Sequence, residues 1–307
     1  MIQSSRSDGN LPPLKSEAGL EKGYPRIRRR FGKIASYIQL LRPFTGLAPL
    51  LSGLFGVLAP VGTITFEHVK TAVFVGVTLM LCQFCGQVLN QWSDYEIDML
   101  TRKYRPIPQG TISRDEALGI AWLLAIFAVG RAFTVSVTFG LYTLTILFFS
   151  VFYSLAPLSP RRVHPILNTL WLAFSRGLIP FLATVTVYGT LDLAAPWAVF
   201  GFLWVLAYQP SKDVHDMEAD RKFGVQTIPN TYGLKGYRTY MIIVSLALWV
   251  YAALQLHVAL LLLPISIIAI TGLGKKVDGL ENDLSWIMFY IGLGLAYIIM
   301  FASTRLG

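Results

Sequence analysis

The chain has 307 residues, of which 54% are hydrophobic and only 14% are charged, and its mean hydropathy is +0.56. So small a polar fraction excludes a soluble globular domain of this length and indicates a membrane protein with several spans. The net charge of +9 does not require a nucleic-acid partner, and we expect none, because cytoplasmic loops of membrane proteins are rich in Lys and Arg.

The N-terminal part of the chain is polar, carries Pro and Gly at intervals, and ends in a basic cluster that includes Arg28 and Arg30. We expect residues 1–35 to form a disordered cytoplasmic tail whose last part lies on anionic lipid. No apolar stretch precedes the cluster, so the sequence does not predict a secretory signal peptide. Residues 36–307 are then expected to form one transmembrane domain.

Apolar segments follow one another through the rest of the chain, and about nine of them approach the length that a helix needs to cross a bilayer. The sequence therefore predicts an all-α membrane protein of about nine transmembrane helices. If the N-terminus is cytoplasmic, all but four of the 26 basic residues fall in cytoplasmic regions, as the positive-inside rule requires. The segments lie near residues 37–60, 71–93, 115–134, 136–156, 165–188, 193–212, 237–256, 258–274 and 284–303.

A polar stretch after the second apolar segment places Asn90, Asp94 and Asp98 four residues apart, and we call these residues the first motif. In a helix the three side chains share one face. Polar groups at the mouth of a membrane segment are costly unless they are paired or bind a cation. The first motif therefore indicates a functional site.

A second stretch, after the sixth apolar segment, repeats this spacing. Tyr208, Lys212, Asp216 and Asp220 again lie four residues apart and are called the second motif. A single DxxxD at the end of a helix is usually a solvated helix face. Two copies on the same side of the membrane, each beside basic residues, favour one shared site.

The residue types in the two motifs indicate a metal ion and a phosphorylated ligand. Carboxylate and carboxamide oxygens suit Mg²⁺, which is usually shared with substrate phosphates. The neighbouring cations would balance the charge of a diphosphate, and Arg can contact it through two hydrogen bonds. The pattern predicts a lipid-tailed diphosphate whose head lies at the membrane surface. The expected metal ligands are Asn90, Asp94, Asp98, Asp216 and Asp220, and the expected diphosphate partners are Arg102, Lys103, Arg105 and Lys212.

With these motifs the chain resembles the UbiA superfamily of intramembrane prenyltransferases. The first motif matches the NxxxDxxxD signature of that family, and the second matches YxxxK followed by DxxxD. The likeness extends to Arg42-Pro43 at the first helix and to Tyr153-Ser154 at the end of the fourth, and Arg42 and Tyr153 are expected to bind the substrate. The resemblance implies a ring of nine helices around a central cavity, capped on the cytoplasmic side by the two motif loops. It further implies that Mg²⁺ and an isoprenyl diphosphate bind at the aspartates.

The expected reaction moves an isoprenyl group to an aromatic or lipid acceptor. Metal ions and cations such as Lys212 stabilise the departing pyrophosphate. The remaining allylic carbocation is held away from water, where Tyr153 and Tyr208 offer aromatic faces. Asp98 either assists the final proton loss or only binds metal. Arg176, an isolated charge inside the fifth segment, is expected to face the cavity, where it contacts an acceptor carboxylate, or to form a structural pair.

Two other functions stay open at this point. A terpene cyclase of the same superfamily would ionise the diphosphate and close the cation on itself, and a transporter would bind a coupling cation near the membrane midplane. Among transferases, the sequence resembles the homogentisate and quinone-precursor branch most, while the chlorophyll-synthase and archaeal ether-lipid branches remain possible. The sequence does not specify the length of the prenyl chain.

Overall fold

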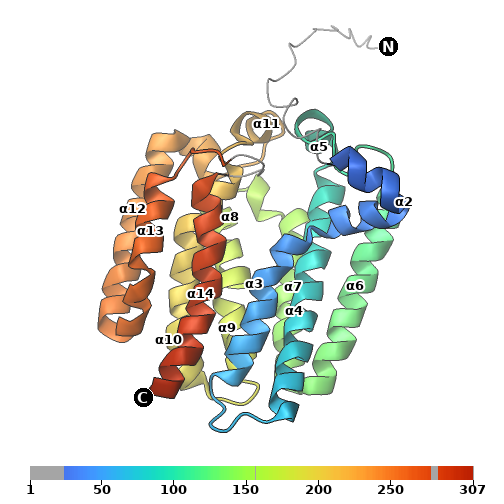
Figure 1. Cartoon of the computed structure of the whole chain (residues 1–307). Helices are drawn as coiled ribbons and strands as arrows, with labels where there is room; N and C mark the ends of the chain where they lie inside the picture. The colour runs from blue at the N-terminus through green and yellow to red at the C-terminus, as the bar shows by residue number, and fades with distance from the viewer. Residues whose placement is uncertain (1–23, 156, 278–282, 307) are drawn as a thin grey trace, which may run out of the picture.

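The computed structural model describes residues 24–155, 157–277 and 283–306. Within these ranges the chain is helical apart from turns, loops and one isolated bridge between Lys276 and Asp283. Seven helices of the described part are long and apolar enough to cross a membrane, which agrees with the predicted all-α membrane fold (Figure 1). They are α4 (Phe66–Ser93), α6 (Arg114–Val135), α7 (Val137–Ser154), the continuous segment of α8 (Pro165–Leu172), η4 (Ala173–Leu178) and α9 (Ile179–Val185), α10 (Leu191–Tyr208) with η5 (Gln209–Asp213), α12 (Ile228–Gln255) and α14 (Leu284–Leu306).

The first expected span is interrupted by a break at Arg42. Pro43 lacks an amide hydrogen and restricts the residue before it. Arg42 adopts a left-handed conformation, with φ 53° and ψ 65°, which is uncommon for a non-glycine residue. Three short elements then continue the chain: η1 (Pro43–Gly46), α3 (Leu47–Leu51) and η2 (Ser52–Gly56).

The segment before this break is also helical. Helix α2 (Tyr24–Leu41) is kinked at the non-helical Gly32, and it includes residues 24–35, which the sequence analysis assigned to a disordered tail. The rest of that predicted tail, residues 1–23, lies outside the described residues.

The eighth expected span is shorter than a full bilayer crossing. It consists of η6 (His257–Leu262) and α13 (Leu263–Thr271), which together form a short apolar helix. Together with the broken first span, this leaves the expected number of nine transmembrane helices unconfirmed.

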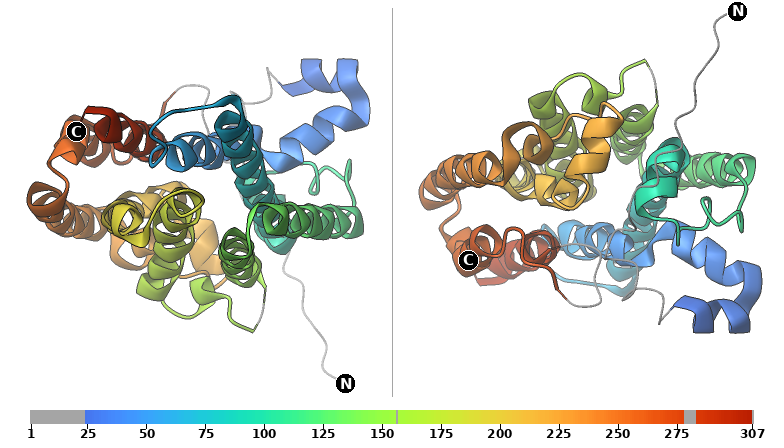
Figure 2. Two further views of the ribbon diagram at one scale, coloured as in Figure 1. Left: turned by 90° about the horizontal axis from the view of Figure 1, so that it is seen from below. Right: turned by 90° about the horizontal axis from the view of Figure 1, so that it is seen from above.

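The helices stand side by side in a ring, which is visible along the bundle axis (Figure 2). Around the ring, α3 packs on α4, α7 on α9, α10 on α12, and α13 on α14, which returns to α3. A close approach of two backbones joins η2 to α4, where a Cβ atom on Gly53 would lie only 2.1 Å from the Cα atom of Gly76. Small residues let membrane helices approach this closely.

Two apolar cores hold the ring together. One core surrounds α10, α12, α13 and α14 and includes Trp204 and Phe289, whose backbone oxygen accepts a 3.0 Å hydrogen bond from Trp204 Nε1. The other core joins α4, α6 and α7 and includes Val88, Ala121 and Phe139. The chain therefore has two packed halves, and the ring can enclose space between them.

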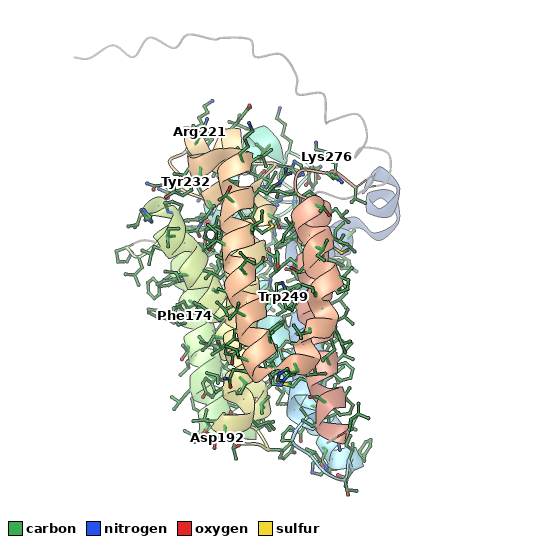
Figure 3. All side chains as sticks on the ribbon, turned by 90° about the vertical axis from the view of Figure 1, so that its left-hand side faces the viewer. Phe174, Asp192, Arg221, Tyr232, Trp249 and Lys276 are labelled. Carbon is green, nitrogen blue, oxygen red and sulfur yellow. The ribbon has the colours of Figure 1, made fainter. Side chains whose placement is uncertain are left out.

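Both motifs lie at the same end of the bundle. Helix α5 (Tyr95–Thr101) follows α4, and α11 (Met217–Lys222) follows η5, and both cap the upper end in Figure 1. Figure 3 shows Arg221 and Lys276 at this end and Asp192 at the opposite one. The two motif loops thus form a common cap, as expected.

Candidate active site

A cavity lies beneath the cap, with about 1000 Å³ of empty space that includes the solvent at its opening, and we call it the polar chamber. Charged side chains from distant parts of the chain meet in its wall. The acidic lining residues are Asp94, Asp213, Asp216 and Asp220, and the cationic ones are Arg42, Arg102, Arg105, Arg161, Arg176 and Lys212.

A second cavity, with about 550 Å³ of empty space that includes the solvent at its opening, is mostly apolar and is called the apolar chamber. Its wall includes Leu79, Ile146, Phe289, Leu293 and Tyr297. The walls of the two chambers have four residues in common, so the chambers adjoin each other. These residues are Thr45, Gln83, Ser175 and Arg176.

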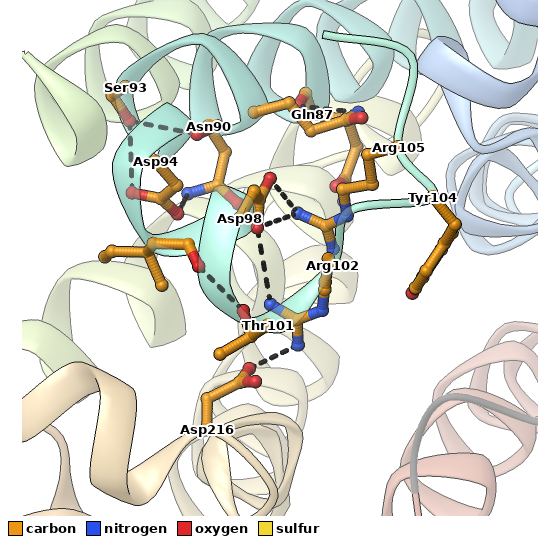
Figure 4. A network of polar contacts seen from close by, with 12 residues as sticks. Gln87, Asn90, Ser93, Asp94, Asp98, Thr101, Arg102, Tyr104, Arg105 and Asp216 are labelled. Carbon is orange, nitrogen blue, oxygen red and sulfur yellow. Dashed lines mark hydrogen bonds and ion pairs between the residues drawn. The ribbon is translucent and has the colours of Figure 1, made fainter. Parts of the chain in front are cut away.

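Asp94 stands at the junction between α4 and α5. Its carboxylate accepts a 2.7 Å hydrogen bond from Asn90 Nδ2, as Figure 4 shows. Arg161 donates to both carboxylate oxygens, over 2.9 Å from Nη1 and 2.5 Å from Nη2. Burial opposes ionisation of Asp94, but the charge and hydrogen bonds of Arg161 outweigh it and hold the pKa of Asp94 below its usual value.

Asp98 has a different environment, although it belongs to the same motif. Its side chain is fully buried and accepts hydrogen bonds of 2.9 and 2.7 Å from Nη1 of Arg105 (Figure 4). Burial raises the pKa of Asp98, and the charge of Arg105 only partly opposes that shift. Asp98 is not part of the chamber wall, which differs from the expectation that it faces the ligand.

The two motifs are linked through Arg102, whose Nη1 lies 3.8 Å from Asp98 Oδ1 and which donates a hydrogen bond to the Asp216 carboxylate (Figure 4). Asp220 makes no hydrogen bond or ion pair through its side chain within the described part of the protein. Burial and the negative charges of Asp213 and Asp216 raise the pKa of Asp220 to about 8.

Lys212 and Tyr153 form a contact in the wall of the polar chamber. Lys212 Nζ donates a 2.8 Å hydrogen bond to the Tyr153 hydroxyl and lies 3.6 Å from Asp213 Oδ1. The guanidinium of Arg161 lies 5.4 Å from the centre of the Tyr153 ring. Tyr153 is therefore held between two cations beside the aspartates.

Two residues expected at the substrate lie elsewhere. Lys103 is exposed, and Tyr208 is fully buried, with its hydroxyl 2.7 Å from Ser245 Oγ and 2.5 Å from Ser266 Oγ. Neither residue lines a chamber. Tyr208 does not line the chamber with Lys212 because α10 changes into the 3₁₀-helix η5 (Gln209–Asp213) between them. The two side chains therefore no longer share a helix face. Tyr208 instead ties α10 to α12 and α13.

Two charged wall residues were not among the predicted site residues. Arg161 stands beside Arg162 in a basic loop, and nothing in this pair indicates that only the first is buried. Asp213 directly follows Lys212, and this adjacency to a predicted site residue was the sequence signal that could have placed Asp213 in the site.

The donor set can be tested against Mg²⁺. Within the described ranges, no three His, Cys, Asp or Glu side chains are grouped closely enough to enclose a metal ion. The wall offers separate carboxylates, and the raised pKa of Asp220 indicates negative charge that a cation would relieve. These features fit Mg²⁺, which keeps several waters and shares its coordination with phosphates.

Comparison with known proteins gives consistent matches. The model of the UbiA prenyltransferase family matches residues 46–293. Digeranylgeranylglyceryl phosphate synthase from Thermococcus sibiricus is 29% identical over 225 residues, which cover 70% of this chain and 75% of that protein. The protein of the same name from Methanothermobacter thermautotrophicus is 26% identical over 278 residues, covering 87% of this chain and 95% of the relative.

Solved structures share the fold. A UbiA homolog from Archaeoglobus fulgidus bound to DMAPP and Mg²⁺ has a TM-score of 0.70 at 18% identity, covering 89% of this chain and 100% of that one. A UbiA homolog from Aeropyrum pernix has a TM-score of 0.62 at 17% identity, covering 86% of this chain and 97% of that one.

Proposed function

Because this multi-pass membrane protein belongs to the UbiA prenyltransferase family, we propose that it transfers an isoprenyl group from an allylic diphosphate to an acceptor within the membrane. The observation that carries this proposal is the contact between the polar and apolar chambers at Thr45, Gln83, Ser175 and Arg176. A prenyl diphosphate needs these two environments side by side, one for its charged head and one for its chain.

Asp94, Asp216 and Asp220 are the residues that we propose to hold Mg²⁺, with Asn90 beside them. The metal would supply charge that stabilises the pyrophosphate as it leaves. The Archaeoglobus fulgidus homolog bound to Mg²⁺ and DMAPP supports this choice of cofactor.

Cationic side chains of the polar chamber would bind the diphosphate. Lys212, Arg102 and Arg105 line the chamber, and their positive charges favour the leaving group over the intact ester. Tyr153 presents an aromatic ring in the same wall, where it can face an allylic cation. The adjoining apolar chamber would hold the prenyl chain and keep water from the cation.

The position of Arg176 supports the proposal that the acceptor carries an anionic group. It lies in the π-helical turn η4 (Ala173–Leu178), within a membrane span, and borders both chambers. Within the described residues it has no hydrogen bond or ion pair, and an unpaired charge at such a position is unfavourable. We therefore propose that Arg176 pairs with the acceptor anion.

A lipid phosphate is the first candidate for that anion. Relatives that match most of the chain are named digeranylgeranylglyceryl phosphate synthase, which supports an isoprenyl glyceryl phosphate as the acceptor. The aromatic acceptor of a quinone pathway is the alternative, and its carboxylate would use the same arginine.

An assay with purified protein separates these possibilities. The protein is incubated with Mg²⁺, labelled prenyl diphosphates of several lengths, and either an isoprenyl glyceryl phosphate or an aromatic carboxylic acid. We expect pyrophosphate release to depend on the acceptor and to yield a labelled prenylated lipid. Formation of a cyclic hydrocarbon or alcohol without any acceptor would contradict the transferase proposal and indicate a cyclase.

We also propose that the capped end faces the cytoplasm, since most basic residues lie in regions assigned to that side. Tags at residue 10 and within residues 223–235 should be protected from an impermeant reagent in intact cells. A tag after Gly307 should react. Labelling of the 223–235 tag in sealed cells would reverse the orientation.

A further inference from the structure

Arginine side chains neutralise three of the motif aspartates. Arg161 forms an ion pair with Asp94, Arg102 forms one with Asp216, and Arg105 forms one with Asp98. Two of these aspartates, Asp94 and Asp216, are among the residues assigned to Mg²⁺ above. Metal binding must therefore compete with charges that the chain itself supplies.

The Arg161–Asp94 pair is the most complete of these contacts at the chamber wall. Both Nη atoms of Arg161 reach the carboxylate, and Nη2 also donates a 2.9 Å hydrogen bond to Ser93 Oγ. The side chains are only 4% and 14% exposed. A divalent cation on Asp94 would lie close to this guanidinium, and like charges at close range in a poorly hydrated site repel strongly. Binding of a divalent cation at Asp94 therefore favours movement of the Arg161 side chain away from Asp94.

Arg161 lines the polar chamber and keeps one hydrogen-bond donor unused. Its Nε atom is buried without a hydrogen-bond partner. Its backbone is anchored, because Gln226 N donates a 2.6 Å hydrogen bond to the Arg161 carbonyl oxygen. A movement of the side chain within the chamber would therefore leave the loop in place. Diphosphate oxygens suit a guanidinium through paired hydrogen bonds.

The charge in the chamber wall favours simultaneous binding of metal and diphosphate. Six cationic residues face four aspartates in this wall, and Asp98 lies behind Arg105. With all five carboxylates ionised, Asp220 included, these groups carry a net charge of about +1, which is close to electrical balance. A dication alone or a diphosphate alone would disturb this balance, and uncompensated charge in a buried site is costly. Binding both together changes the net charge much less.

Building on the proposed function, we propose that Arg161 is an exchangeable counterion and a positioning residue for the reaction. It neutralises Asp94 when Mg²⁺ is absent and moves to the diphosphate when Mg²⁺ and diphosphate bind together. Metal alone must displace Arg161 without offering it a new partner, and diphosphate alone must compete with Asp94. Arg161 thereby couples the two binding events.

Metal binding can be measured without any turnover. Mn²⁺, used as a spectroscopic substitute for Mg²⁺, is titrated into purified protein by electron paramagnetic resonance, with and without inorganic pyrophosphate. Arg161→Gln should bind Mn²⁺ alone about tenfold more tightly than the wild type, and pyrophosphate should enhance its Mn²⁺ affinity about tenfold less. Arg162→Gln removes the exposed neighbouring charge and should match the wild type.

The remaining outcomes are also decisive. If Arg161→Gln and Arg162→Gln titrate alike, the counterion exchange is wrong. If the Gln variant does not fold, Arg161→Lys keeps the charge without the two-pronged contact, and it should shift both quantities in the same direction by a smaller factor. Unchanged coupling in a folded Lys variant would also overturn the exchange. Failure of the wild type to bind Mn²⁺ even with pyrophosphate would instead contradict the proposed function.

Discussion

Asp94 and Asp220 occupy motifs with the same four-residue spacing, yet they have opposite electrostatic environments. Asp94 is held by Arg161 through two hydrogen bonds and has a pKa below its usual value. Asp220 has no such partner within the described residues, and burial together with Asp213 and Asp216 raises its pKa to about 8. The ionisation of each carboxylate thus depends on which distant loop brings an arginine to it, and the motif spacing does not determine it.

The strongest test asks whether the two motifs act as one site despite this difference. Asp94→Ala and Asp216→Ala should each lower turnover about 1000-fold or more, because each removes a proposed metal ligand and stabilisation of the leaving group. Prenyl transfer is measured in the presence of Mg²⁺ and again with EDTA. Both variants should still elute as folded protein in detergent. Full activity in EDTA would contradict a metal-dependent site.

A second test concerns the two aspartates of the first motif. Arg105→Met leaves Asp98 buried without its main partner and should lower the free energy of unfolding by about 3–5 kcal/mol. The double variant Asp98→Leu/Arg105→Met removes both charges and should recover most of that loss. Thermal unfolding in detergent measures both effects. Equal stability of the single and double variants would show that Asp98 does not need Arg105.

A third test separates binding of the acceptor at Arg176 from binding of the prenyl diphosphate at the two motifs. Arg176→Leu should raise KM for an anionic acceptor about tenfold to 100-fold, since it removes a charge-assisted contact. The affinity for the prenyl diphosphate should change little, because the motif residues are intact. Arg238→Leu, which removes a charge that lines neither chamber, is the matched control. A loss of diphosphate binding equal to the rise in acceptor KM would contradict this separation of roles.

The smallest expected effect follows from the raised pKa of Asp220. A carboxyl whose pKa is higher in the folded than in the unfolded state favours folding when protonated, so its contribution is lost as pH rises towards about 8. Between pH 6 and 7 the metal-free protein should lose about 1 kcal/mol of stability. Asp220→Asn should remove this pH dependence. A wild-type stability that increases over this range, measured in EDTA, would contradict the raised pKa.

Much of the architecture followed from hydropathy and spacing, whereas the details that depend on tertiary contacts did not. The apolar segments predicted an all-helical membrane fold, and the charge pattern predicted that both motif loops share one end. Pro43 was a signal for a break in the first span, and it was overlooked. Tyr208 was assigned to the site because regular α-helical spacing was assumed through a segment that becomes 3₁₀-helical.

Arg161 could not have been distinguished from Arg162 by sequence. Both are basic, adjacent and in the same loop, and only the packing of that loop brings Arg161 to Asp94. The role of Asp98 was equally hidden, because a carboxylate that binds metal and one that pairs with arginine have the same spacing. Such differences depend on contacts between residues far apart in the chain.

The ion pairs of the cap differ in how long the growing chain must wait for them. Arg105 follows Asp98 by seven residues, so this pair can form as soon as the first loop leaves the ribosome. Arg161 follows Asp94 by 67 residues, and Asp216 follows Arg102 by 114. At ordinary rates of synthesis the last interval takes roughly 6–23 s. The local pair therefore exists first, and the link between the two halves of the cap can form only after most of the ring has been made.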